Sequence, residues 1–218
     1  LFALFAIAST AWAATNCDVG GYSSYISGTD FRFGAHHEPV VQGGCTFSAT
    51  NGAYTNLWGS QSLRNPGFDR TTANEFDLTV GWSGKITDKW SADAHAAYWD
   101  IVNPRLFNGT NGDVVNGGGL LRYSITPETS VYVLGEGYHG IGALGFAGGW
   151  KAGIGAKTTV GPAVVDGTLT HNHNFGASGE FVKVAGTSVS PIVKFGGGEL
   201  RPIVAAYVPY GRYTKTRE

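Results

Sequence analysis

The chain has 218 residues, and its 15 basic and 16 acidic side chains give a formal net charge of −1. This balance supplies no basic surface for a phosphate backbone, so nucleic acid is excluded as the expected partner. Charged residues make up only 14% and aromatic residues 13%, and 34 residues are glycine. That composition excludes a disordered chain and a coiled coil.

The N-terminal segment predicts an export signal. Residues 1–14 carry no charge, and the chain contains no methionine. We interpret residues 1–13 as a signal peptide whose basic start is missing. Ala11 and Ala13 flank Trp12 in the small-x-small pattern of a cleavage site, so the mature chain is expected to begin near Ala14. A membrane anchor is the alternative, but the apolar run is shorter than the about 20 residues that a spanning helix needs.

Two cysteines, Cys17 and Cys45, remain in the mature chain. In an exported protein they form either one disulfide or two unpaired small residues on neighbouring strands. Sequence alone does not set the geometry that a disulfide needs, so both alternatives stay open.

Alternation with a period of two runs through most of the chain, and it predicts β-strands. The clearest run covers residues 74–85. One face of this run carries large apolar side chains: Phe76, Leu78, Val80 and Trp82. The other face carries mostly polar or small residues, including Glu75 and Asp77. The next run, residues 89–101, repeats the pattern.

In chain order the predicted strands cover residues 18–34, 40–49, 53–62, 74–85, 89–101, 116–125, 130–140, 146–158 and 163–171. The links between them alternate in length. Those at 50–52, 86–88, 126–129 and 159–162 are short, whereas those at 63–73, 102–115 and 172–178 are longer. Short turns at one end and longer loops at the other are typical of an outer-membrane barrel.

The C-terminal third allows two interpretations. One strand over residues 180–195 would place Lys183 on the same face as Val189, and a lysine facing lipid near mid-bilayer costs about 2–4 kcal/mol. A break at residues 185–187 removes the conflict, and it predicts strands at 179–185, 188–196 and 201–213, for twelve in all. Without the break there are eleven, and a last strand would be missing from a truncated C-terminus.

The expected fold is therefore all-β: a transmembrane antiparallel up-and-down β-barrel of about twelve strands over residues 14–218. Only a helix or a closed sheet satisfies every backbone group in lipid. The inner face would hold acids and bases of mixed sign, which we predict to line the pore: Glu75, Asp77, Asp93, His95, Arg122, Glu136, Lys151 and Asp166. Lys194 is assigned to the same face.

Several segments resemble the TorF family of porins. They are residues 31–34, 39–44, 51–54, 57–60, 75–77, 81–84 and 97–98, with the sequences FRFG, PVVQGG, NGAY, LWGS, EFD, GWSG and AY. The resemblance covers residues 18–101 and implies a porin-like barrel in the outer membrane of a Gram-negative bacterium. It implies no catalytic residue and no defined solute.

Other chemistry is weakly supported. The pairs His36–His37 and His171–His173 lie at predicted loop ends, and apart from Glu38 beside the first pair no Cys or carboxylate is close enough to complete a site. We therefore interpret them as solvated loop histidines and predict no metal site. The glycine runs 117–119 and 196–198 lack the helix and the Lys-Ser/Thr of a phosphate loop. No nucleophile elbow is present, so neither an enzyme nor a cofactor is expected.

The predicted function is a narrow pore in the bacterial outer membrane for small solutes or ions, with membrane lipid as its surroundings and an undetermined oligomeric state. The alternative is a non-conducting structural or adhesive barrel that acts through its extracellular loops, chiefly residues 102–115. A secreted soluble barrel with an apolar ligand inside is the third class.

Overall fold

The computed structural model describes residues 12–22, 39–63, 74–101, 113–141, 148–161, 163–173, 182–191, 193–195, 198–200 and 204–210. These residues form an all-β fold. Its strands are β1 (Trp12–Tyr22), β2 (Val40–Ala49), β3 (Ala53–Ser62), β4 (Glu75–Lys85), β5 (Trp90–Ile101), β6 (Val114–Ser124), β7 (Thr129–Gly140), β8 (Gly149–Val160), β9 (Ala163–His173), β10 (Val182–Pro191), β11 (Val193–Phe195), β12 (Gly198–Leu200) and β13 (Val204–Tyr210). Within the described residues, no helix is long and apolar enough to cross a membrane.

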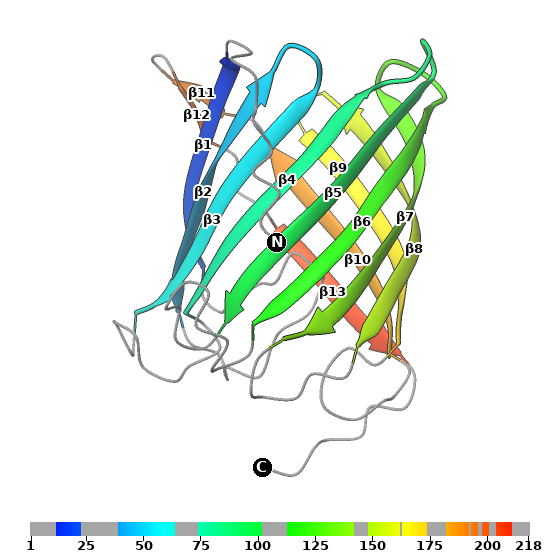
Figure 1. Cartoon of the computed structure of the whole chain (residues 1–218). Coiled ribbons are helices and arrows are strands. Elements are labelled where there is room, and N and C mark those ends of the chain that lie inside the picture. The colour runs from blue at the N-terminus through cyan, green and yellow to red at the C-terminus, as the bar shows by residue number, and fades with distance from the viewer. Residues whose placement is uncertain are drawn as a thin grey trace.

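One antiparallel sheet contains eleven of these strands, in the order β1 to β10 followed by β13. Each strand from β1 to β9 pairs with the next one along the chain, which is an up-and-down arrangement (Figure 1). The short strands β11 and β12 form a separate hairpin. The predicted all-β, antiparallel, up-and-down architecture is therefore confirmed.

The sheet curves strongly, so that β10 and β13 pass behind β4 to β6 in Figure 1. Among the described residues, no ladder of hydrogen bonds joins β1 to β13, and the sheet is open along these two edges. Both edge strands run towards the same end of the sheet, because strand direction alternates along an antiparallel sheet and β1 and β13 are its first and eleventh strands. A closed barrel is thus not part of the described structure.

The two ends of the sheet differ in their connections. Tight turns join β2 to β3, β4 to β5, β6 to β7 and β8 to β9 at the upper end in Figure 1. Gly52 adopts a positive φ of 89° in the first turn. In the next two turns, the hydroxyl oxygens of Thr87 and Thr126 accept hydrogen bonds from the backbone amides of Trp90 and Thr129. Longer connections join the strands from β1 to β10 at the opposite end, as predicted. The link from β10 to β13 is an exception, because it lies at the end with the tight turns but is long and contains β11 and β12.

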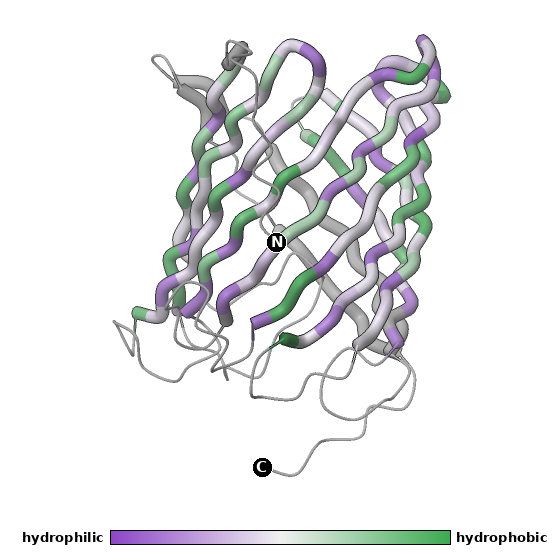
Figure 2. The backbone as a smooth tube through the Cα atoms, in the orientation of Figure 1, coloured by the Kyte–Doolittle hydropathy of each residue, from purple (hydrophilic) through white to green (hydrophobic). Residues whose placement is uncertain are grey.

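The strands have two faces of opposite polarity, and Figure 2 shows the alternation along them. We call the concave side the inner face and the convex side the outer face. Glu75 is buried on the inner face, whereas Val80 of the same strand is 49% exposed on the outer face. Directly paired residues of antiparallel strands share a face, so the register extends this division from strand to strand.

Some predicted boundaries are wrong. The first strand was expected over residues 18–34, but β1 begins at Trp12 and ends at Tyr22; residues 23–34 lie outside the described part of the chain. Its ladder with β2 is regular from Ala14, the first residue of the predicted mature chain. The signal peptide over residues 1–13 stays a prediction.

The predicted break at residues 185–187 is also wrong, because β10 runs through it and pairs with β9 and β13 on both sides. The reason is the position of Lys183 in the strand. β10 begins at Val182, so Lys183 lies at its end rather than at its middle, level with His171. A charge near the end of a membrane strand costs only about 0–1 kcal/mol. The count of twelve strands is not confirmed, since eleven form the sheet.

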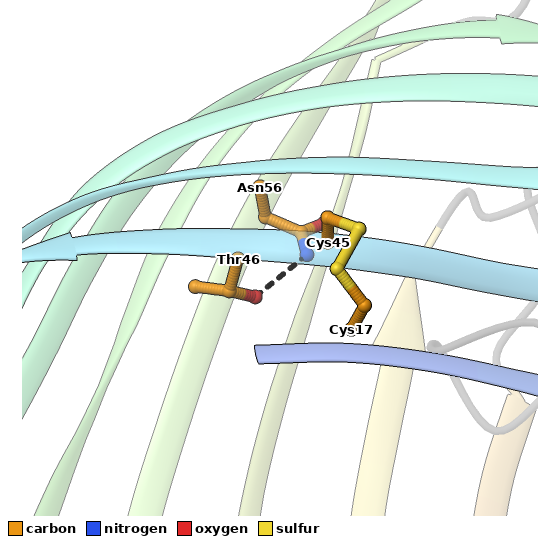
Figure 3. The surroundings of a disulfide bond; sticks show 4 residues. All are labelled: Cys17, Cys45, Thr46 and Asn56. Carbon is orange, nitrogen blue, oxygen red and sulfur yellow. Dashed lines mark hydrogen bonds between the residues drawn. A yellow bond between two sulfur atoms is a disulfide. The ribbon is translucent and has the colours of Figure 1, made fainter. Parts of the chain in front are cut away.

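A disulfide joins Cys17 of β1 to Cys45 of β2, which are directly opposite each other in the ladder. The two residues share the outer face, while Thr46 and Asn56 belong to the inner face, where Asn56 Nδ2 donates to Thr46 Oγ1 at 2.8 Å (Figure 3). The bond ties the edge strand β1 to the rest of the sheet. It settles the alternative that the sequence left open.

We expect the double variant Cys17→Ala/Cys45→Ala to lose about 3 kcal/mol of unfolding free energy, because the bond closes a chain segment of 28 residues. Urea unfolding followed by tryptophan fluorescence measures the loss. Reduction of the wild-type protein is the matched control and is expected to give the same loss. Equal stability of the oxidised and reduced wild-type protein would contradict the prediction.

Candidate functional site

A row of residues crosses the inner face from β3 to β8. The register places the following residues side by side, one from each strand: Tyr54, Gly81, His95, Gly118, Glu136 and Lys151. Glycine alternates with large polar residues over most of this row. The row therefore brings together side chains that are far apart in the sequence.

Three residues of this row and Asp93, two residues before His95, form a continuous chain of contacts. His95 Nδ1 lies 3.1 Å from Asp93 Oδ1, and His95 Nε2 lies 3.6 Å from Glu136 Oε1. Lys151 Nζ lies 3.2 Å from Glu136 Oε2, and the lysine side chain is only 4% exposed. We call Asp93, His95, Glu136 and Lys151 the charge row. A buried ammonium needs such a partner, because an unpaired charge away from water is strongly unfavourable.

Two tyrosine hydroxyls complete the charge row. Tyr54 Oη donates a hydrogen bond to Asp93 Oδ1 at 3.2 Å, and Tyr138 Oη donates to Glu136 Oε2. Each of the two carboxylates therefore receives a hydroxyl as well as a charged or imidazole partner. Hydrogen bonds to ionised acceptors are stronger than those between neutral groups, so this arrangement fixes the positions of the two carboxylates on the inner face of the sheet.

Gly118 allows Glu136 to reach His95 across β6. A Cβ at Gly118 would lie 2.4 Å from Glu136 Cγ and 2.5 Å from the carbonyl oxygen of Gly135. Neither distance is possible for a real side chain, and the second atom belongs to the backbone and does not move aside easily. The neighbouring Gly117 faces the other side, where the nearest atom is 3.6 Å away. The charge row thus depends on glycine at position 118.

A second inner-face cluster surrounds Tyr132. Its hydroxyl donates to Asp166 Oδ1 at 2.6 Å and also contacts Thr168 Oγ1. The guanidinium of Arg122 lies 5.2 Å from the centre of the tyrosine ring and donates to Ser130 Oγ at 3.2 Å. We call this group the Tyr132 cluster. The cluster joins side chains of β6, β7 and β9, and the ring of Tyr132 covers the backbone of β8 at Gly155.

Glu75 and Asp77 form the third group of predicted residues. They lie on the inner face of β4, towards the end with the longer connections, and they pair with Ser60 and Trp58 of β3. Glu75 is buried. Two acids thus share one face of β4 near this end of the sheet.

All eight residues predicted to line a pore belong to the inner face by register. Asp93, His95, Glu136 and Lys151 come together in the charge row, and Arg122 and Asp166 in the Tyr132 cluster. Lys194 was placed on the same face, but it lies in β11, outside the main sheet.

Sequence reasoning missed three tyrosines that hold these clusters together: Tyr54, Tyr132 and Tyr138. A signal was present, because Tyr138 lies two residues after Glu136 and therefore on the same face of a strand. The selection of charged residues alone excluded it.

The interpretation of His171 and His173 as loop histidines is wrong. Both lie in β9, where their rings pack against Trp150, with centroids 5.2 and 5.7 Å apart. His36 and His37 lie outside the described residues. In the part of the chain that the structure describes, no three or more His, Cys, Asp or Glu side chains are placed to hold a metal ion.

Comparisons with known proteins give no relative: no protein-family model, no curated protein and no solved structure matches the chain.

Replacement of Gly118 by alanine tests the close packing of the wall. We expect Gly118→Ala to lower the unfolding free energy by about 2 kcal/mol, because the new methyl group overlaps the Gly135 backbone and displaces Glu136. Gly117→Ala is the matched control and is expected to change it by less than about 1 kcal/mol. Urea unfolding of both variants measures the difference. Equal effects would show that Gly118 has no special role.

Proposed function

We propose that the chain forms a transmembrane β-barrel of a bacterial outer membrane and acts as a narrow pore for small solutes or ions. One observation carries this proposal: the exposed face is apolar and the buried face is charged. Ile154 on the outer face is 60% exposed, whereas Lys151 on the inner face is 4% exposed. Water-soluble proteins bury charged residues rarely and expose large apolar patches rarely, so this arrangement favours a surface that meets hydrocarbon.

The dimensions of the strands support a membrane location. The strands from β1 to β10 contain 10 to 12 residues each. A tilted strand needs about 9–11 residues to cross the hydrocarbon layer. Short turns at one end and longer connections at the other match the usual arrangement of outer-membrane barrels.

Aromatic residues near the tight turns also support it. Trp90 and Tyr123 are cross-strand partners whose ring centroids lie 4.9 Å apart, next to the turn that follows β4. Trp82 lies on the outer face of β4, where its indole nitrogen donates to the carbonyl oxygen of Asn51 at 2.9 Å. Rings with an apolar body and a polar edge favour the level of the lipid headgroups.

The inner face suits the passage of polar solutes. The eight inner-face residues named from the sequence are five acids, two bases and one histidine, so acids outnumber bases even when the histidine counts as a cation. Fixed charge of one sign on a narrow wall favours ions of the opposite sign. The pore is therefore expected to prefer cations weakly. The eight inner-face residues named from the sequence act by setting the potential along it.

The same proposal includes signal-peptide cleavage near Ala14, membership of the TorF family and about twelve strands in the closed barrel. An even number of strands places both ends of a single-chain barrel on the periplasmic side.

The membrane location is tested by arginine at two exposed valines. Val80 is 49% exposed at the centre of β4, and Val160 is 62% exposed at the end of β8, next to a tight turn. In vesicles, Val80→Arg is expected to cost about 2–4 kcal/mol of folding free energy and Val160→Arg only about 0–1 kcal/mol. In water, both variants would be nearly neutral, because arginine replaces an exposed side chain. Urea titration in phospholipid vesicles measures both values. Two equally small costs would refute the membrane location.

Pore function is tested by removing the buried ammonium. Lys151→Gln removes one positive charge from the charge row, so we expect the cation-to-anion permeability ratio to rise about threefold. The reversal potential across a planar bilayer in a salt gradient measures this ratio. Asp88→Asn, in an exposed tight turn, is the control and should leave the ratio unchanged. Channels with the wild-type ratio in Lys151→Gln would contradict the role given to the inner face.

A second candidate is the non-conducting structural or adhesive barrel. The observation that favours it is the burial of inner-face groups, since Lys151, Glu75 and Asn116 are all buried. A wall whose charges are covered can fill a narrow barrel instead of lining a wet channel. Vesicle-inserted protein without single-channel steps would select this candidate over the pore.

A further inference from the structure

An apolar groove lies on the outer face of β5 to β9, near the tight turns. It has a volume of about 780 Å³, which is within the range of sites for small molecules, and its lining is almost entirely apolar. Its walls include Trp90, Tyr123, Ile154 and Leu169. We call it the outer groove. The groove is separate from the charge row, which occupies the other face of the same strands.

The register explains why a groove forms here. One row on the outer face runs from Trp90 through Tyr123 and Val131 to Ala156 and Gly167. Side-chain size falls along this row, from indole to no side chain. The next row keeps branched residues on β6 to β9, with Ile154 and Leu169 beside the positions where the first row narrows to Ala156 and Gly167. The small residues therefore form the floor, and the rings and branched chains form the walls.

A positive charge lies at one end of the outer groove. Lys89 precedes Trp90, and its Nζ lies 5.9 Å from the centre of the Tyr123 ring that lines the groove. The aromatic pair and the lysine are at the level of the tight turn of residues 86–89. In the proposed membrane location this level is that of the headgroups, where a cation meets lipid phosphates.

We propose that the outer groove binds one acyl chain of a glycerophospholipid, whose phosphate lies at Lys89. This inference rests on the proposed membrane location. The match is one of charge and of lining: the apolar lining of the groove suits hydrocarbon, and the ammonium of Lys89 at its end suits an anion. A second copy of the chain and a peptide fit less well, because the groove offers almost no polar groups to pair with a backbone.

Native mass spectrometry of the full chain in detergent tests the proposal, with phosphatidylglycerol and diacylglycerol of equal chain length as probes. Ala156→Leu fills the floor, and we expect it to weaken binding of both lipids about tenfold. Ala96→Leu is the matched control, because Ala96 is an exposed outer-face alanine of β5 away from the groove. It is expected to change neither affinity. Lys89→Gln should weaken phosphatidylglycerol about threefold and leave diacylglycerol unchanged.

Equal affinities of Ala156→Leu and Ala96→Leu would overturn the groove as a lipid site. Equal loss of both lipids in Lys89→Gln, or no loss, would overturn the assignment of the phosphate. Dimers that disappear in Ala156→Leu would assign the groove to a second copy. Ile154→Ala removes part of the wall and gives an independent reading if Ala156→Leu does not fold. Wild-type protein that inserts into vesicles but fails these tests refutes the groove alone, whereas failure to insert refutes the proposed function.

Discussion

The division of each strand into two faces is the constraint on which the rest of the structure depends. Backbone geometry sends successive side chains to opposite sides, and the antiparallel ladder aligns these sides across the sheet. In this chain the charged side is the buried one. Buried charges need partners, which explains the ion pairs and tyrosine hydroxyls of the charge row. The apolar side is the exposed one, which is the arrangement that the proposed membrane location requires.

The high glycine content serves both faces. On the inner face, Gly118 and Gly155 leave space for Glu136 and for the ring of Tyr132, so large side chains lie flat against the wall and reach partners beyond the adjacent strand. On the outer face, Gly167 belongs to the floor of the groove. In both cases the missing side chain lets a neighbouring group, or a ligand, approach the backbone. The high glycine content thus allows close packing of side chains on the inner face and leaves space for the outer groove on the other face.

The strands and their faces could be predicted because the signal lies within each strand. β2 and β3 have the predicted bounds of 40–49 and 53–62, and the alternation in β4 assigns its faces correctly. The site contacts could not be predicted, because they depend on register between strands. Tyr54 and Asp93 are 39 residues apart, and Tyr132 and Asp166 are 34 apart. The false break in β10 has a related cause, since the cost of Lys183 depends on where the strand begins.

The two edge strands set a condition on any membrane location. β1 and β13 run in the same direction, so a direct seam between them would be parallel, whereas antiparallel closure needs an even number of strands. An unpaired edge is unfavourable in lipid, because no water is present to satisfy its amides and carbonyls. The disulfide holds β1 in register with β2. Because the disulfide fixes the register of β1, this strand presents a fixed edge to the strand that would close the sheet. The proposed membrane location therefore requires a closed sheet.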